Sequence, residues 1–378
     1  SLSVRPPSWR PDLTDPSDLV EEVVRLHGYD VIPSTLPTAP PGRGLTHEQR
    51  LRRRVATVLA ARGLVEVLNY PFVGDAELDA LLLPAHDTRR RTPRLANPLS
   101  EEQPHLRGTL LPGLLGTARR NTGRGAANLA LFEIGSVFLG EVQASTQLRP
   151  TVSGRPTDDE WRGLNGLLPH QPTHVAALVS GQREPDGWWG PARAASWADA
   201  IEVARIIAET CGVELVARAG SDPSFHPGRC AELSVGGTVI GAAGELHPRV
   251  IEAAALPERT AAMWLDLDAV MAASPPVRPA PSVGTQPLAK EDLALVVDRA
   301  VPAARVQAAL AEGAGPLLES VRLFDVYEGP QVPEGKKSLA FALRFRAPDR
   351  TLDAAETAGA RAGALARAAE TCGATLRT

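Results

Sequence analysis

The chain has 378 residues, of which 43% are hydrophobic and 22% are charged, and its formal net charge is −4. These values are typical of a globular protein of two or three domains, and they give no overall positive charge that would indicate nucleic acid or an anionic membrane as a partner. The sequence has no apolar run of 18 residues, no signal-peptide pattern at its first residues and no CxxC pair among its three cysteines. We therefore expect a cytoplasmic protein with no membrane partner, disulfide framework or cysteine zinc site.

The first notable segment is acidic. Residues 9–30 hold six carboxylates. Asp15 followed by Pro16 predicts a helix start, because Asp is a preferred N-cap and Pro suits the first helical position. Asp18 then falls where a carboxylate can complete a capping box. Gly28 predicts the end of this helix.

Capping does not use every acid in this segment. Asp18, Glu21 and Glu22 are spaced so that they share one helix face, and Asp12 lies in the extended stretch just upstream. Two interpretations stay open. The segment is either a capped, solvated acidic turn or a magnesium site, because carboxylate oxygens are the ligands that Mg²⁺ prefers.

The middle of the chain, residues 45–272, predicts one domain that mixes helices with an antiparallel sheet. Apolar spacing and capping residues predict helices over 47–62, 111–121 and 197–211. Strand patterns cover 64–73, 127–140, 174–181, a hairpin in 231–248 that turns at Gly236–Gly237, and 263–272. Residues 141–173 are rich in Gly, Pro and mixed charge, and they predict an irregular surface insertion.

The last part, residues 283–378, follows a proline-rich linker at 273–283 and predicts the order βαββαβ of a ferredoxin-like fold. In the strand at 338–346 the apolar Leu and Phe side chains alternate with small and basic ones. The apolar face must pack on the two helices, so Arg344 and Arg346 are predicted on an open face. That face either receives nucleic acid or is an ordinary solvated surface.

Several motifs in the right order resemble the β subunit of bacterial phenylalanyl-tRNA synthetase. They are "PSWRPDLTDPSDLVEEVVRLHGYDVIPSTLP", "ANPLSEEQPHLRGTLLPGLLGTARRN", "LFEIGSVF", "FHPGRCAEL", "GELHP", "LLESVRLFDVYEG" and "GKKSLAFALRFRAPDRTL". The resemblance covers nearly the whole chain, and it implies the C-terminal part of such a subunit, without the family's upstream tRNA-binding and editing domains.

The resemblance implies an α+β fold in three parts. Residues 1–38 would be the C-terminal tail of a small helical domain, residues 45–272 a class II synthetase-like domain built on an antiparallel sheet, and residues 283–378 a ferredoxin-fold anticodon-binding domain. It also implies an α₂β₂ tetramer with the catalytic α subunit, which consumes ATP to charge tRNA-Phe with phenylalanine. Because the family places a Mg²⁺ in the acidic segment, the resemblance favours a metal site there, with the matching positions Asp12, Asp18, Glu21 and Glu22.

We expect no catalytic residues in this chain. The strand Leu131–Ile134 lacks the arginine that class II synthetases place two residues before the glutamate to contact ATP, and no GxGxxxER stretch follows. The family's β subunit is likewise catalytically silent. Arg107 resembles a catalytic arginine, but we interpret it as a helix-entry or interface salt-bridge residue.

The ferredoxin-like part resembles the module that grips the tRNA anticodon stem. Such binding combines phosphate contacts from basic side chains with stacking on unpaired bases. The predicted contacts are Lys290, Arg322, Lys336, Lys337, Arg344, Arg346 and Arg350. The alternatives are a paralogous protein-interaction scaffold without tRNA binding, and a metal-dependent hydrolase that uses the acidic segment, although neither a nucleophile nor a pocket for the latter is evident.

Overall fold

A computed structural model describes residues 3–38, 41–140, 154–278, 280 and 283–377. The chain forms two compact units, Ser1–Arg278 and Pro279–Thr378, and each is described by itself. The finer division of the first unit at residues 38–45 stays a prediction. In the described ranges, no helix is both long enough and apolar enough to cross a membrane.

The acidic segment forms the predicted helix α1 (Pro16–His27), which is followed by the short 3₁₀ turn η1 (Tyr29–Val31). Asp15 caps the helix by accepting a hydrogen bond from the Ser17 N–H at 2.7 Å, and Asp18 completes the capping box by accepting from the Asp15 N–H at 2.9 Å. Gly28 ends the helix with a φ of 100°, a backbone conformation that favours glycine. The predicted start and end of this helix are confirmed.

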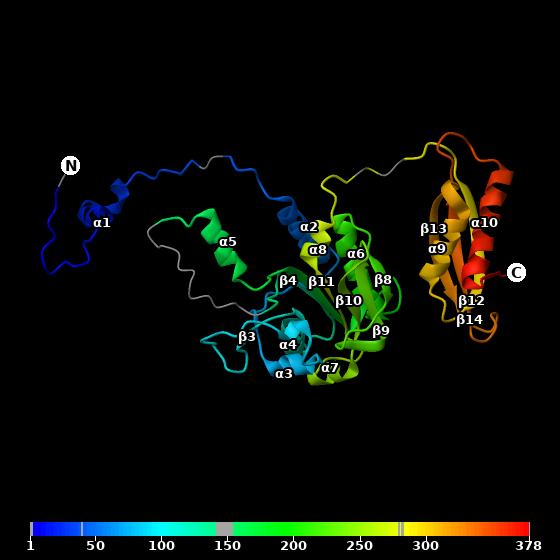
Figure 1. Cartoon of the computed structure of the whole chain (residues 1–378), viewed down its shortest axis with the longest axis horizontal. Helices are drawn as coiled ribbons and strands as arrows, with labels where there is room; N and C mark the ends of the chain where they lie inside the picture. Colours follow the sequence, from blue (N-terminus) through cyan, green and yellow to red (C-terminus); the bar gives the residue numbers. More distant parts are fainter. Residues whose placement is uncertain (1–2, 39–40, 141–153, 279, 281–282, 378) are drawn as a thin grey trace. The chain divides into compact units, whose positions relative to one another are not determined.

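The core of the first unit is a seven-stranded sheet (Figure 1). Its first two strands are parallel and all other neighbours are antiparallel, so the sheet is mixed rather than wholly antiparallel. In spatial order the strands are β1 (Val65–Glu66), β4 (Leu129–Ser136), β5 (Thr173–Ser180), β11 (Ala261–Asp266), β10 (Thr238–Leu246), β9 (Phe225–Val235) and β8 (Val216–Ala219).

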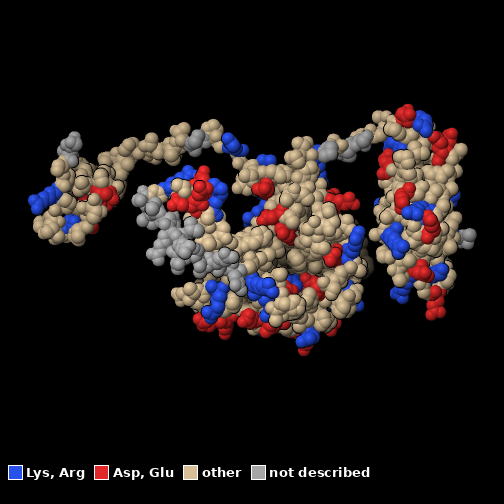
Figure 2. All heavy atoms as spheres, in the orientation of Figure 1, with Lys and Arg blue, Asp and Glu red and all other residues tan. Residues whose placement is uncertain are grey.

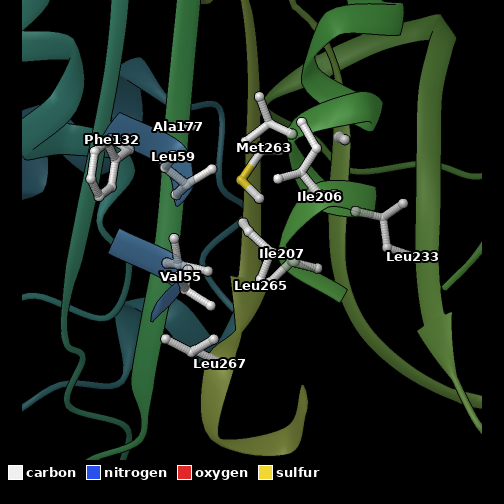
Figure 3. Close-up of a cluster of buried hydrophobic side chains, with 14 of the residues drawn as sticks. Val55, Leu59, Phe132, Ala177, Ile206, Ile207, Leu233, Met263, Leu265 and Leu267 are labelled. Atoms are coloured by element: carbon white, nitrogen blue, oxygen red, sulfur yellow. The ribbon is translucent and has the colours of Figure 1, made fainter. Parts of the chain in front are cut away.

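Helices cover both faces of this sheet. One face packs on α2 (His47–Ala61), α6 (Trp197–Cys211) and α8 (Leu267–Ala272), and the other on α3 (Asp75–Ala80), α4 (Leu111–Thr122) and α7 (Pro248–Ala253). Figure 3 shows side chains of the first cluster, with Val55 and Leu59 from α2 and Ile206 and Ile207 from α6 facing the strands. Because both faces are covered, the interior strand β5 is buried over most of its length.

Smaller elements complete the first unit, and three features differ from the sequence prediction. The single strand predicted over 64–73 is instead two short strands, β1 and β2 (Phe72–Val73), which belong to different sheets. Helix α5 (Asp158–Gly166) lies in the stretch that was expected to be irregular; of that stretch, residues 141–153 lie outside the described residues. The predicted strand at 263–272 is a strand only to Asp266, whose side chain accepts from the Ala269 N–H at 2.9 Å and starts α8. The remaining elements are β3 (His105–Leu106), η2 (Thr88–Arg90), β6 (Gln182–Glu184) and β7 (Arg193–Ala194).

The second unit is the predicted βαββαβ fold. Its elements are β12 (Ala289–Asp298), α9 (Ala303–Ala314), η3 (Gly315–Leu317), β13 (Leu318–Tyr327), β14 (Lys336–Phe345), α10 (Ala354–Cys372) and β15 (Thr375–Leu376). The sheet order is β13-β14-β12-β15, antiparallel throughout. Helices α9 and α10 pack side by side on one face only (Figure 1), over a core that includes Phe341 and Phe345, both 0% exposed.

Replacing Phe341 with Ala should destabilise the second unit by about 3–5 kcal/mol, because the change removes a fully buried ring and leaves a cavity. All six tryptophans lie between residues 9 and 264, so tryptophan fluorescence reports the first unit, while circular dichroism also sees α9 and α10. In denaturant, the variant should show an early loss of helical signal with an unchanged fluorescence midpoint.

The matched control is Phe324→Ala, which removes the same ring from a position that is 50% exposed. This variant should unfold like the parent chain. If both variants lowered the denaturant midpoint of the helical signal equally, the placement of Phe341 in the core of the second unit would be contradicted.

Candidate nucleic-acid interface

The open face of the second unit's sheet brings three of the predicted basic contacts together. Lys290 on β12 lies directly opposite Arg344 on β14, and Arg322 on β13 lies opposite Ala342, one step along the same face. On β14 the neighbours of Arg344 that point the other way, Leu343 and Phe345, are buried against the helices. The same side of β12 is buried further along the strand, from Leu293 to Val297. Strand alternation therefore holds all three cations on the uncovered face.

A shallow pocket of about 310 Å³ lies between these side chains. Its lining includes Lys290, Arg322 and Arg344, together with Asp292 and Phe324. In the part of the chain that the structure describes, none of the three cations forms an ion pair with a carboxylate. Their charge is therefore available to a ligand, and Asp292 offsets only part of it.

Phe324 was missed by the sequence analysis. The pairing of β13 with β14 shifts between Leu323 and Asp325, which leaves Phe324 as an extra residue in a β-bulge. Its ring is 50% exposed and lines the pocket with Arg322. An exposed aromatic ring among basic side chains can stack on an unpaired base while the cations hold phosphates. The bulge follows from strand pairing, so no local sequence signal reveals it.

The other four predicted contacts are placed differently. Lys336 starts β14 on the open face, opposite Asp298. Lys337 lies on the same side of β14 as Leu339 and Phe341, which is the helix-covered side. Arg346 lies beyond the strand end, where it pairs with Glu319 and donates to the Gly284 carbonyl at 2.7 Å. Arg350 pairs with Glu356 at 2.6 Å and Asp349 at 3.1 Å.

These contacts separate the seven residues by role. Arg346 connects the segment before β12 to the edge strand β13, so its contacts stabilise the unit itself. Arg350 bonds to Glu356 in the first turn of α10. Figure 2 shows basic and acidic side chains interspersed on the visible face of this unit. Attraction for a nucleic acid would therefore be local to the open face rather than spread over the surface.

The four acids of the first segment do not gather into a cation site. Asp12 and Glu22 both pair with Arg10, at 2.6 Å for Asp12, and Glu22 also pairs with Arg25. Hydrogen bonds from Arg10 and then Arg25 lower the pKa of Glu22 to about 2, so this carboxylate is ionised at neutral pH.

The remaining two acids are also engaged. Asp18 accepts from the Thr14 and Asp15 N–H groups, and Glu21 accepts from the Tyr29 hydroxyl at 2.7 Å, which raises the pKa of Tyr29. Across the described ranges, no three His, Cys, Asp or Glu side chains are arranged to hold a metal ion. The arrangement seen here does not fit Mg²⁺, because a guanidinium occupies the space between Asp12 and Glu22.

Arg107 and Glu133 form a buried ion pair at 2.6 Å, with side chains 9% and 1% exposed. Arg107 also donates to the Ser136 carbonyl, and Asn69 donates its amide N–H to the second Glu133 oxygen at 2.7 Å. Both Glu133 oxygens and the Arg107 Nε and Nη1 are thus engaged by the protein. The prediction that Arg107 is a salt-bridge residue is confirmed, and its carboxylate partner, Glu133, lies within the same unit.

Replacing Arg107 with Met should destabilise the first unit by about 3–5 kcal/mol, since it leaves the Glu133 carboxylate buried without its cation. The double variant Arg107→Met/Glu133→Gln should recover part of this loss. The measurement is the denaturant midpoint of tryptophan fluorescence.

The control for this prediction is Arg94→Met, which breaks an ion pair with side chains 59% and 78% exposed. Exposed pairs contribute about 0–1 kcal/mol. A loss in Arg107→Met no larger than in the control would contradict the structural role.

Three family models match the chain. Residues 32–267 match the phenylalanyl tRNA synthetase beta chain CLM domain, residues 284–377 the ferredoxin-fold anticodon binding domain, and residues 1–29 the tRNA synthetase B5 domain. The first of these matches covers more than half of the chain, and the second coincides with the unit that carries the open sheet face.

Curated relatives match along the whole chain. The chain is 57% identical to the phenylalanine–tRNA ligase beta subunit of Streptomyces avermitilis, 55% identical to that of Thermobifida fusca and 51% identical to that of Nocardia farcinica. Each match covers 100% of this chain but only 45–46% of the relative, so the chain spans about half the length of the proteins it matches. Together with the family models, these identities show that the chain belongs to the phenylalanyl-tRNA synthetase beta chain family.

Proposed function

We propose that this chain is the non-catalytic C-terminal part of a phenylalanine–tRNA ligase beta subunit, and that its second unit contacts the anticodon region of tRNA-Phe. The observation that carries the proposal is the open sheet face, where Lys290, Arg322 and Arg344 lie together without ion-pair partners among the described residues. Phe324 adds a surface on which a base can stack. The relatives are named phenylalanine–tRNA ligase beta subunits, and this name is the reason for proposing tRNA-Phe as the nucleic acid.

The first unit would serve as a scaffold for the catalytic partner subunit. A class II synthetase-like ancestry for its sheet is part of this proposal, as are the α₂β₂ stoichiometry, the ATP-dependent charging reaction and a cytoplasmic location. The buried Arg107–Glu133 pair supports a structural role, because Arg107 follows β3 and bonds to Glu133 and to the Ser136 carbonyl in β4.

The Mg²⁺ proposal for Asp12, Asp18, Glu21 and Glu22 depends on a rearrangement. Arg10 would have to leave Asp12 and Glu22 before both carboxylates could face a cation. The low pKa of Glu22 means that this residue needs no deprotonation at neutral pH. A partner chain that offers Arg10 another acceptor would favour the exchange.

Charge reversal on the open face tests the tRNA proposal. The double variant Lys290→Glu/Arg344→Glu should weaken tRNA-Phe binding by the full chain, and the slope of log affinity against log salt should fall by about 0.7–0.9 for each lost phosphate contact. Fluorescence anisotropy at several salt concentrations measures both quantities.

The matched control is Lys337→Glu, which reverses the charge on the helix-covered side of β14. It should change affinity and salt slope much less. If the double variant binds tRNA-Phe as well as the parent chain does, the open face is not the tRNA site. If neither the parent chain nor any variant binds tRNA, the alternative of a protein-interaction scaffold is favoured.

Chelation tests the metal proposal. Native mass measurements of the chain with its presumed α subunit should show a complex that weakens when Mg²⁺ is removed, and Glu21→Gln should weaken it in the same way. Asp30→Asn, a neighbouring acid outside the four, is the control and should leave the complex intact. If removing Mg²⁺ leaves the complex unchanged, the metal proposal is rejected and these acids serve only in helix capping and ion pairing.

A further inference from the structure

A second pocket lies in the first unit. It has a volume of about 530 Å³, and its lining includes His174 on β5, Trp264 and Asp266 on β11, Arg89 in η2, and Leu139 after β4. His174 is only 8% exposed. Among the described residues, its imidazole has no hydrogen-bond partner, and the ring belongs to the pocket lining. A buried polar ring without a partner in a cavity indicates that something polar completes it.

The strand register places two acceptors side by side in this pocket. His174 lies directly opposite Asp266 on the antiparallel pair β5–β11, so their Cβ atoms are about 4.5–5.5 Å apart. One Asp266 oxygen caps α8, and the other has no hydrogen-bond partner in the described part of the chain. Burial lowers the pKa of His174 despite the opposing charges of Asp266 and Asp268, so the neutral ring keeps one acceptor nitrogen.

The charges around the pocket favour a cation. The Arg89 guanidinium donates to both Asp87, at 2.8 and 2.9 Å, and Asp222, at 2.8 Å, so its own charge is more than balanced. With Asp266 included, the lining has three carboxylates and one guanidinium. An anion would therefore be repelled, whereas a positive group gains from the excess negative charge.

The same pocket has an apolar wall. The Trp264 ring stacks with His174 at a centroid distance of 5.8 Å and 10° between planes, and the Arg89 Cζ lies 5.8 Å from the Trp264 centroid. Leu139 and Ile240 extend the apolar lining. A ligand that fits must therefore combine a charged end with a short hydrocarbon part.

We propose that this pocket binds a primary ammonium or guanidinium group on a short apolar stem. The N–H donors of the group would reach Asp266 and the acceptor nitrogen of His174, and the stem would lie against Trp264 and Leu139. The group can come from a free small amine or from a Lys or Arg side chain of the partner subunit. The pocket is lined by residues of the first unit, whereas the proposed tRNA face is formed by residues of the second.

The test uses n-butylammonium as the probe and the neutral n-butanol, of the same stem, as its control. The chain has six tryptophans, so its NMR spectrum holds six indole N–H signals, and the signal lost in Trp264→Phe identifies Trp264. Butylammonium should shift that signal in a saturable way, and butanol should not. Absence of a saturable shift up to about 100 mM, or an equal shift with butanol, overturns the proposal, and this comparison needs no binding-site variant.

Asp266→Asn removes the charge but keeps an N-cap side chain at α8, since Asn caps as well as Asp. It should weaken butylammonium binding at least about tenfold, as expected when a partly buried ion pair loses one partner. The matched control is Asp353→Asn, the same change at the N-cap of α10 in the other unit, which should leave binding unchanged. Equal affinity in both variants would also overturn the assignment.

The complex with the partner subunit distinguishes the two sources of the cation. If a partner side chain fills the pocket, butylammonium should no longer shift the Trp264 signal in the complex, and Asp266→Asn should weaken assembly. If the ligand is a free amine, the shift should persist in the complex and assembly should be unaffected.

Discussion

The structure depends most on how each sheet buries its apolar side chains. In the first unit, β5 contributes to hydrophobic clusters on both faces of the seven-stranded sheet, so both faces must be covered by helices. In the second unit, β14 alternates fully buried Leu and Phe with Ala and Arg, so only one face needs helices. This difference in alternation leaves one sheet face uncovered, and that face carries the basic side chains proposed to meet tRNA.

Ion pairing decides which charged residues are available for function. Arg107 and Arg89 are each held by carboxylates within the first unit, and Arg346 is held by Glu319 and two backbone carbonyls in the second. Taking charges out of water is costly, so such groups need partners within the protein. The cations that remain unpaired in the described residues, Lys290 and Arg344 among them, are on an exposed surface where leaving them unpaired costs little.

Local sequence signals predicted most of the fold. Asp15, Thr46 and Gly28 marked helix ends correctly because capping depends on residues within one turn, and the alternation in β14 identified its buried face. The helix α8 was missed because Asp266 ends a strand and caps a helix at the same residue. The Phe324 bulge and the meeting of His174 with Asp266 could not be predicted, since both depend on the register between strands distant in sequence.

The outer strand β13 has one further consequence. At ten residues it is a long edge, and its outward N–H and C=O groups could pair with the same strand of another molecule. Its pairing with β14 is interrupted between Leu318 and Ser320 and again between Leu323 and Asp325. Such irregularities twist an edge away from a straight partner, and Glu319 and Asp325 add charge along it. The bulge that exposes Phe324 thus also protects the protein against edge-to-edge aggregation.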